Sequence, residues 1–176
     1  MHCVVTRQFT DYLFNSTNCR EDFYLGNPSI VAYVNQRLIS IRPPHTMTHL
    51  PRPVGGRCIW KASECRLWLL FYVLPCTLGI LKQRYWKHLS CLVEAIHMLL
   101  SEELTPRMLE TAAVGLLRKF VGRVEPLYKK GGCMTFNVHQ LLHLPKAAEQ
   151  LGPLWAHSAF VFAGGNGEII KSVASA

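Results

Sequence analysis

Aspartate is scarce in this chain of 176 residues. Only Asp11 and Asp22 occur, both near the start, so a mechanism that needs several aspartates from along the chain is excluded. Charged residues make up 17% of the sequence, below the roughly 25% that is typical of soluble domains. Hydrophobic residues make up 49%. The chain therefore has ample apolar surface to bury, and a disordered or collagen-like chain is excluded.

The sequence also lacks the motifs of common catalytic and phosphate-binding sites. It contains no G-x-S-x-G nucleophile elbow, no P-loop and no G-x-G-x-x-G after a strand. The glycine-rich run at residues 163–167 does not have the spacing of a phosphate-binding loop. It is predicted to be a turn.

The seven cysteines are scattered and include no C-x-x-C pair. An odd number in this arrangement indicates a reducing compartment, and no apolar run of signal-peptide length begins the chain. We therefore expect an intracellular protein, nuclear or cytoplasmic, that is not secreted. The longest uncharged apolar run, residues 67–81, includes Pro75. As a helix it would reach about 22 Å against a hydrocarbon core of about 30 Å, so no membrane contact is expected.

Helical periodicity dominates the rest of the sequence. Apolar residues recur at helical spacing in four blocks, at residues 62–74, 85–100, 105–124 and 137–151. Thr105 is the predicted N-cap of the third block, with Pro106 at its first helical position. Asn137 and Gln140 have the spacing of a capping box at the start of the fourth. Residues 1–16 suggest one short helix, and residues 30–41 carry a helical stripe whose β-branched members keep a strand open.

These patterns predict a mainly α fold, a bundle of four or five helices with short irregular or strand segments at both ends. Residues 1–60 form an N-terminal segment with a basic, Pro/Gly-rich loop at residues 42–57. Residues 61–151 form the helical bundle. Residues 152–176 form a C-terminal strand and turn segment, with the strand at 159–162.

Positive charge is concentrated between residues 37 and 66. This segment holds six basic residues and one acidic residue, so 6 − 1 = +5 of the net charge of +8 lies there. Arginines on such a loop suit phosphate contacts, which dominate nucleic-acid affinity. A solvated loop, or pairing with acidic groups of a larger protein, explains the same charge. The candidate nucleic-acid-binding residues are Arg37, Arg42, Arg52, Arg57 and Lys61.

Two histidines form a candidate metal site. His139 and His143 stand at i and i+4 of the fourth block, so both imidazoles lie on one helix face, a spacing used for zinc. Gln140 occupies the position of the catalytic glutamate in H-E-x-x-H and cannot act as a base. Cys133 and His157 are the further candidate ligands. The site is a weak candidate, because such histidines are more often hydrogen-bonded in or near a core.

Six blocks, taken in order, resemble one family. They are MHCV, RLISIRPPHTMTHLPRP, WKASECRLWLLFYVLP, ILKQRYWKHLSCLVEAIHMLL, NVHQLLHL and GPLWAHSAFVFAGGNG. Together they are similar to the C-terminal half of transposase-like proteins encoded by CACTA (En/Spm-type) DNA transposons of the metazoan branch. The resemblance covers residues 1–173.

The resemblance implies a fragment of a ribonuclease-H-like core, in which three carboxylates hold two Mg²⁺ ions and a helical insertion precedes the third carboxylate. In that family the second aspartate lies just before the block that matches Met1, His2 and Cys3, so this chain is expected to start immediately after it. The third carboxylate position matches Ala163, which has no oxygen to offer a metal. No catalytic residue and no bound cofactor are therefore expected in this chain.

The leading functional hypothesis is a truncated, catalytically inactive transposase-like protein with residual DNA-binding potential. Its expected partners are DNA and either a missing N-terminal catalytic segment or a second copy of the chain. One alternative is a fragment of an active, metal-dependent DNA transposase whose upstream exons are missing. Another is a domesticated helical module that binds a protein partner.

Overall fold

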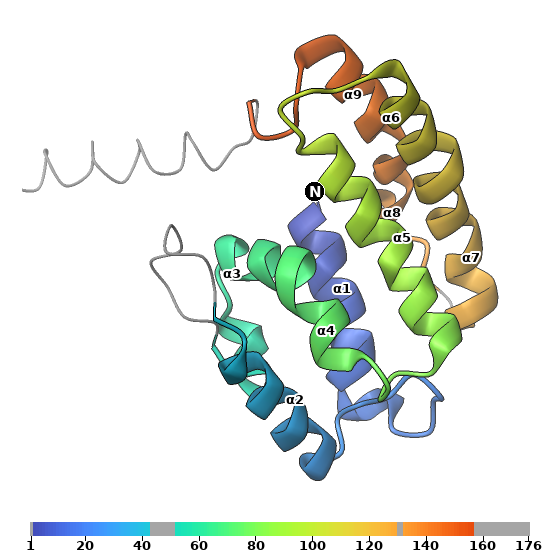
Figure 1. Cartoon of the computed structure of the whole chain (residues 1–176). Helices are drawn as coiled ribbons and strands as arrows, with labels where there is room; N and C mark the ends of the chain where they lie inside the picture. The colour runs from blue at the N-terminus through green and yellow to red at the C-terminus, as the bar shows by residue number, and fades with distance from the viewer. Residues whose placement is uncertain (1, 43–51, 130–131, 157–176) are drawn as a thin grey trace, which may run out of the picture.

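The computed structural model describes residues 2–42, 52–129 and 132–156, shown in colour in Figure 1. Every regular element in these ranges is helical, which confirms the prediction of a mainly α protein. The expected strand at 159–162 and Ala163 lie outside the described residues. One hydrophobic core runs from Val5 to Leu154 and draws on all three predicted regions.

Two helices form the N-terminal part. α1 (His2–Phe14) buries Val5, Phe9 and Leu13 at helical spacing. α2 (Pro28–Ser40) begins with Pro28 at a position that needs no N–H donor, and the Asn27 side chain accepts a hydrogen bond from the amide of Ser29. The stripe at residues 30–41 therefore forms a helix, and the strand alternative is wrong.

Part of the expected basic loop is structured. Val54–Ile59 forms a 3₁₀ helix, η2, after the short 3₁₀ turn η1 (Ser16–Asn18) earlier in the chain. The amide of Val54 donates to the Asn35 side chain of α2 at 2.9 Å, and the Val54 side chain is fully buried. Residues 43–51 of that loop lie outside the described residues.

The first predicted block of the bundle is one continuous run of three segments. α3 (Ala62–Leu67) continues into a π-helical stretch, η3 (Trp68–Tyr72), and then into α4 (Val73–Thr77). Pro75 lies in α4 and lacks the N–H that would extend the hydrogen-bond ladder. The wider π turn directly precedes it, as expected where a helix adjusts its ladder.

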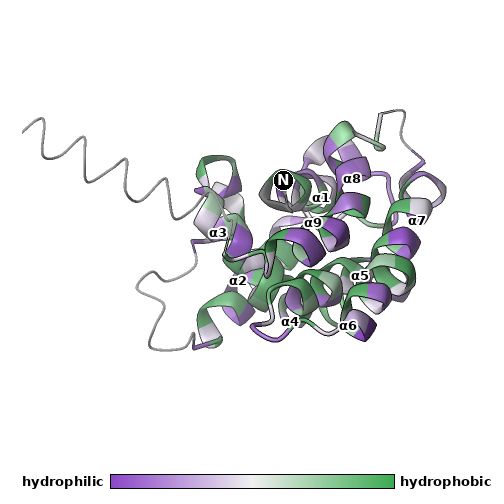
Figure 2. Ribbon diagram, turned by 90° about the horizontal axis from the view of Figure 1, so that it is seen from above, coloured by the Kyte–Doolittle hydropathy of each residue, from purple (hydrophilic) through white to green (hydrophobic). Residues whose placement is uncertain are grey.

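α5 (Gln83–Leu99) is the central helix. It lies antiparallel to the run formed by α6 (Pro106–Glu110), the π-helical η4 (Thr111–Leu117) and α7 (Arg118–Tyr128) (Figure 1). Its buried residues are Tyr85, His88, Leu89, Cys91, Leu92, Val93, Ala95, Ile96 and Leu99. The ribbon of α7 alternates between hydrophilic and hydrophobic turns (Figure 2).

The predicted start of the third block is confirmed. The Thr105 hydroxyl accepts a hydrogen bond from the amide of Met108 at 3.2 Å, and Pro106 is the first helical residue. The block extends beyond the predicted end at residue 124 to Tyr128, and Lys129 closes it in the left-handed conformation with φ of 46°.

The predicted N-cap of the fourth block, Asn137, is wrong by two residues. The block consists of α8 (Phe136–Gln140), the 3₁₀ turn η5 (Leu141–His143) and α9 (Leu144–Leu151). Its N-cap is Thr135, whose hydroxyl accepts from the amide of Val138, and Asn137 lies inside the first turn. A hydroxyl suits the N-cap because it accepts a hydrogen bond from the amide three residues later, which has no partner within the helix. Pro145 falls in the first turn of α9, where its missing N–H costs little.

Aromatic rings join α1, α5 and α7. The Phe9 ring lies 5.1 Å from the rings of both Phe120 and Tyr128, measured between centroids. Tyr128 also lies 5.6 Å from Tyr85 and 5.1 Å from Phe23. Mutual edge and tilted contacts of this kind add to the burial of apolar area.

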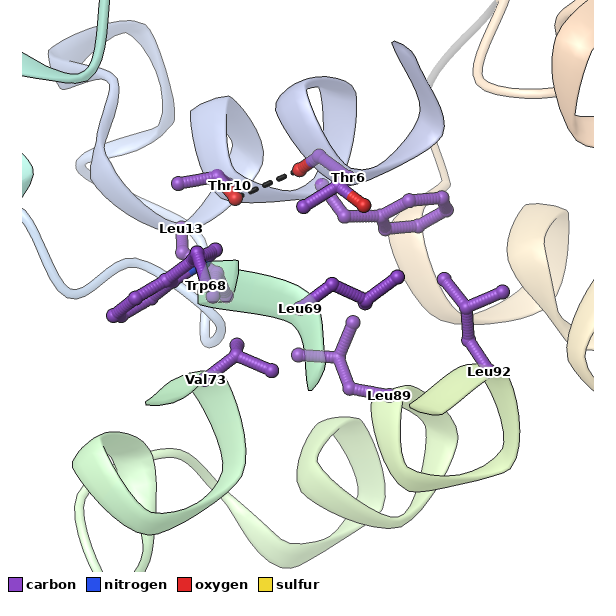
Figure 3. A pocket seen from close by; sticks show the side chains of 9 residues that line it. Thr6, Thr10, Leu13, Trp68, Leu69, Val73, Leu89 and Leu92 are labelled. Carbon is purple, nitrogen blue, oxygen red and sulfur yellow. Dashed lines mark hydrogen bonds between the residues drawn. The ribbon is translucent and has the colours of Figure 1, made fainter. Parts of the chain in front are cut away.

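The cavity in Figure 3 lies between α1, the run from α3 to α4, and α5. Its walls are apolar apart from Thr6 and Thr10, and the hydroxyl of Thr10 donates to the carbonyl of Thr6 at 2.7 Å. It offers about 10 Å³, which is the room of one water molecule. An organic ligand is too large for it.

Leu92 is fully buried and lines this cavity, so Leu92→Ala removes packing from the centre of the bundle. We expect the free energy of unfolding to fall by about 2–5 kcal/mol. Ile39→Ala is the control, because Ile39 is 72% exposed and its truncation is expected to cost less than about 0.5 kcal/mol. Urea denaturation measures both, and equal losses would contradict this assignment of the core.

Candidate nucleic-acid interface

The Arg37 guanidinium contacts the end of α4. It donates to the carbonyl of Leu78 at 2.6 Å and to those of Pro75 and Cys76 at 3.4 Å. It also donates to the Tyr33 hydroxyl at 2.9 Å and lies 4.5 Å from the centre of that ring. Because the last carbonyls of a helix carry partial negative charge, the cation stabilises this helix end.

Arg52 forms a two-pronged ion pair with Glu64. Its Nε and Nη2 atoms donate to the two carboxylate oxygens at 2.6 and 2.5 Å. The same carboxylate accepts from the amide of Lys61 at 2.8 Å, at the start of α3. The hydrogen bond from Arg52, followed by that from the Lys61 backbone, lowers the pKa of Glu64. Arg52 therefore ties the chain before η2 to the start of α3.

Arg57 joins η2 to α1. Its Nε donates to the Asp11 carboxylate at 2.9 Å, and its side chain is only 19% exposed. Arg42 and Lys61 are exposed, and neither forms an ion pair within the part of the chain that the structure describes. Of the five predicted nucleic-acid-binding residues, three thus have their guanidinium groups in contacts inside the protein. A DNA contact through these three has to compete with those contacts.

A second basic surface lies between α5 and α7. We call it the α5–α7 groove, and it is lined by Gln83, Arg84, Lys87, Arg123, Pro126 and Leu127. No carboxylate is among these lining residues. Lys119 stands one helical turn before Arg123 on α7. Lys87, Lys119 and Arg123 make no ion pair with any described residue.

The charged side chains of this surface affect the pKa of Cys91, which is buried. Burial raises the pKa of the Cys91 thiol, while the positive charges of Lys119 and Arg123 oppose that rise. Cys91 follows Lys87 by one turn of α5, and its thiol donates to the carbonyl of Lys87 at 3.3 Å. The negative charge of Glu94 acts on the Cys91 pKa in the opposite direction to Lys119 and Arg123. Arg84, Lys87 and Arg123 line the groove, and Lys119 lies one helical turn from Arg123.

Asp22 stands at the edge of this face. Its carboxylate accepts hydrogen bonds from Lys82 at 2.7 Å and from Arg84. The hydrogen bond from Lys82, together with the charges of both cations, lowers the pKa of Asp22. This carboxylate neutralises one end of the basic surface, and it is half exposed.

The sequence prediction missed this groove. Its only signal was the helical spacing of residues 84 and 87 on one block and 119 and 123 on another. Nothing in that spacing states that the two blocks pack against each other. The sequence prediction considered only the denser charge of the segment at residues 37–66.

The two candidate metal ligands lie together on the surface. His139 and His143 are both exposed, and their ring centroids are 5.7 Å apart. Cys133 is buried, and its carbonyl accepts a hydrogen bond from Gln8. His157 lies outside the described residues. Within the described residues no group of three or more His, Cys, Asp or Glu side chains is placed to hold a metal ion.

His88 is the buried polar group behind the α5–α7 groove. Its Nε2 lies 2.8 Å from the carbonyl of Phe120, and its Nδ1 lies 3.4 Å from the Tyr128 hydroxyl. The ring stacks on Phe120 with centroids 4.2 Å apart. Because a carbonyl only accepts, Nε2 carries the proton and Nδ1 accepts from Tyr128. Burial lowers the pKa of His88 to about 4, so the ring is neutral.

Comparisons with protein-family models, curated proteins and solved structures find no match to this chain. No helix in the described ranges is long and apolar enough to cross a membrane. The function therefore has to be argued from the surfaces of this molecule.

The neutral His88 makes the stability depend on pH. Between its unfolded pKa of about 6.5 and its folded pKa of about 4, the unfolded chain binds more protons. We therefore expect the free energy of unfolding to fall as the pH drops through this window, by about 3 kcal/mol from this group. His88→Phe removes the titrating group and is expected to flatten the curve there. Parallel curves for the two proteins, from urea denaturation at each pH, would contradict this.

Proposed function

We propose that this protein is a catalytically inactive, transposase-like DNA-binding protein that holds the DNA backbone in the α5–α7 groove. The observation that carries the proposal is the positive surface of Lys87, Lys119 and Arg123, none of which forms an ion pair within the described residues. Arg84 adds to this surface, although it pairs with Asp22 at its edge. Phosphate contacts by such cations release counterions from DNA and bind without regard to sequence. The apolar lining residues Pro126 and Leu127 suit the sugar edges between phosphates.

The proposed placement in the transposase family rests on the six sequence blocks. The described bundle, in this proposal, is the helical insertion of a ribonuclease-H-like core. The exposed Arg42 and Lys61 extend the DNA contact toward the segment at residues 37–66. Arg37, Arg52 and Arg57 support it only indirectly, by fixing that segment to α1, α3 and α4.

The two Mg²⁺ ions of an intact family member do not fit the residues of this chain. Asp11 is paired with Arg57, and Asp22 with Lys82 and Arg84. Ala163 stands at the expected position of the third carboxylate and offers no oxygen. We therefore propose DNA binding without strand cleavage and derive no metal-dependent step.

The groove is tested with the double variant Lys87→Glu/Arg123→Glu and a labelled duplex of random sequence, followed by fluorescence anisotropy. We expect at least a tenfold loss of affinity at low salt. The slope of log affinity against log salt should become shallower by about 2, because two phosphate contacts are lost.

The control is Arg107→Glu/Lys146→Glu, which changes the net charge equally at two exposed residues on α6 and α9. If both variants weaken binding to the same extent, affinity follows net charge and the groove is not the site. Strand cleavage by the wild-type protein with Mg²⁺ would overturn the inactive assignment.

Asp22 provides a second test, in which the substitution should raise the affinity for DNA instead of lowering it. Asp22→Asn removes the charge that pairs with Lys82 and Arg84, so affinity for the duplex is expected to rise several-fold at low salt. Glu21→Gln changes the net charge equally at an exposed neighbour and should have a smaller effect. Equal gains in the two variants would show that Asp22 does not compete for this surface.

A further inference from the structure

We propose that His139 and His143 chelate a divalent transition-metal ion on the surface of the bundle, at a site separate from the α5–α7 groove. Both imidazoles are exposed, and their centroids are 5.7 Å apart. Borderline ions such as Zn²⁺, Ni²⁺ and Cu²⁺ prefer imidazole nitrogen, which distinguishes them from Mg²⁺ and Ca²⁺. The two imidazole donors therefore select a transition-metal ion over Mg²⁺ or Ca²⁺.

The fold presents the two rings on one side. Thr135 caps the start of α8, and Val138 and Leu141 are fully buried on the opposite face. These buried contacts fix the rotation of the helix. They leave His139 and His143, one turn apart, on the outer face.

The separation of the rings fits a shared ion. Two imidazoles bound to one tetrahedral ion through Zn–N bonds of about 2.0–2.1 Å have centroids roughly 5 Å apart. The observed separation of 5.7 Å therefore needs only small changes in side-chain torsions. The planes of the two rings meet at 66°.

The site has open coordination positions. No third His, Cys, Asp or Glu side chain joins the pair within the described residues, and Gln140 between them supplies no base. Water or a donor from another molecule completes the coordination. Because two imidazoles hold the ion, affinity should follow the order Cu²⁺ > Ni²⁺ and Zn²⁺.

Isothermal titration of the full chain with CuCl₂ and ZnCl₂ tests the site. We expect the tightest event to take one ion per chain. His139→Ala and His143→Ala should each weaken it at least tenfold, with an unchanged far-ultraviolet spectrum. Both residues are exposed, so neither substitution is expected to unfold the protein.

A register variant separates this site from the other histidines and cysteines. His139→Ala/Asn137→His keeps the number of histidines but separates the pair by six residues, which places the rings on different faces of the helix. We expect it to bind as weakly as His139→Ala. Equal affinity of wild type and register variant would overturn the proposal. Binding that is lost on cysteine alkylation but kept in both alanine variants would also overturn it.

Discussion

The contact between His88 and the carbonyl of Phe120 fixes how α5 and α7 lie against each other. It is buried, and stacking on Phe120 and the Tyr128 hydroxyl hold the ring in place. An unpaired polar group at this depth would be costly, so the two helices have one favourable register. Phe9 of α1 packs on both Phe120 and Tyr128 and extends this register to the N-terminal helix.

The fixed alignment of α5 and α7 determines which of their side chains meet on the outer surface. Residues that flank the contact on α5 and α7, among them Lys87 and Arg123, are brought to one groove because their helices cannot slide. Within the described residues, Lys87, Lys119 and Arg123 have no acidic partner that would draw them together, and like charges repel. The packing of the core therefore offsets the repulsion between these cations. The resulting positive surface suits a polyanion.

The two basic regions of the chain have different roles. The guanidinium group of Arg37 binds a helix end, and those of Arg52 and Arg57 each bind a carboxylate. These contacts hold the N-terminal segment on the bundle. Asp11 and Asp22 both pair with cations, one inside the fold and one at the edge of the groove.

Much of the helical fold was predictable because apolar spacing directly reflects burial. Four helical blocks after residue 61 were identified from this spacing, although the start of the fourth was misplaced. The Thr105 cap was identified from its hydroxyl side chain followed by Pro106. The π turns η3 and η4 were not predicted, since they depend on how neighbouring helices pack. For the fourth block, the spacing to Gln140 predicts an N-cap at Asn137. Thr135, two residues earlier, also has a cap side chain, and the backbone conformation makes it the actual N-cap.

The candidate site was less predictable than the fold. Charge density along the sequence pointed to residues 37–66, but density does not show which cations are paired. Glu64 pairs with Arg52 inside this segment, and the distant Asp11 pairs with Arg57. The α5–α7 groove is formed by residues some forty positions apart, such as Lys87 and Arg123. The helical spacing of the histidine pair, in contrast, is local, and the two rings do lie together.

The most direct test of this account is amide hydrogen exchange of the full chain with and without duplex DNA at low salt. The account predicts slower exchange on addition of DNA in the first turns of α5 and along α7. Slower exchange confined to η2 and the start of α3, or no change anywhere, would contradict the placement of the DNA backbone in the α5–α7 groove.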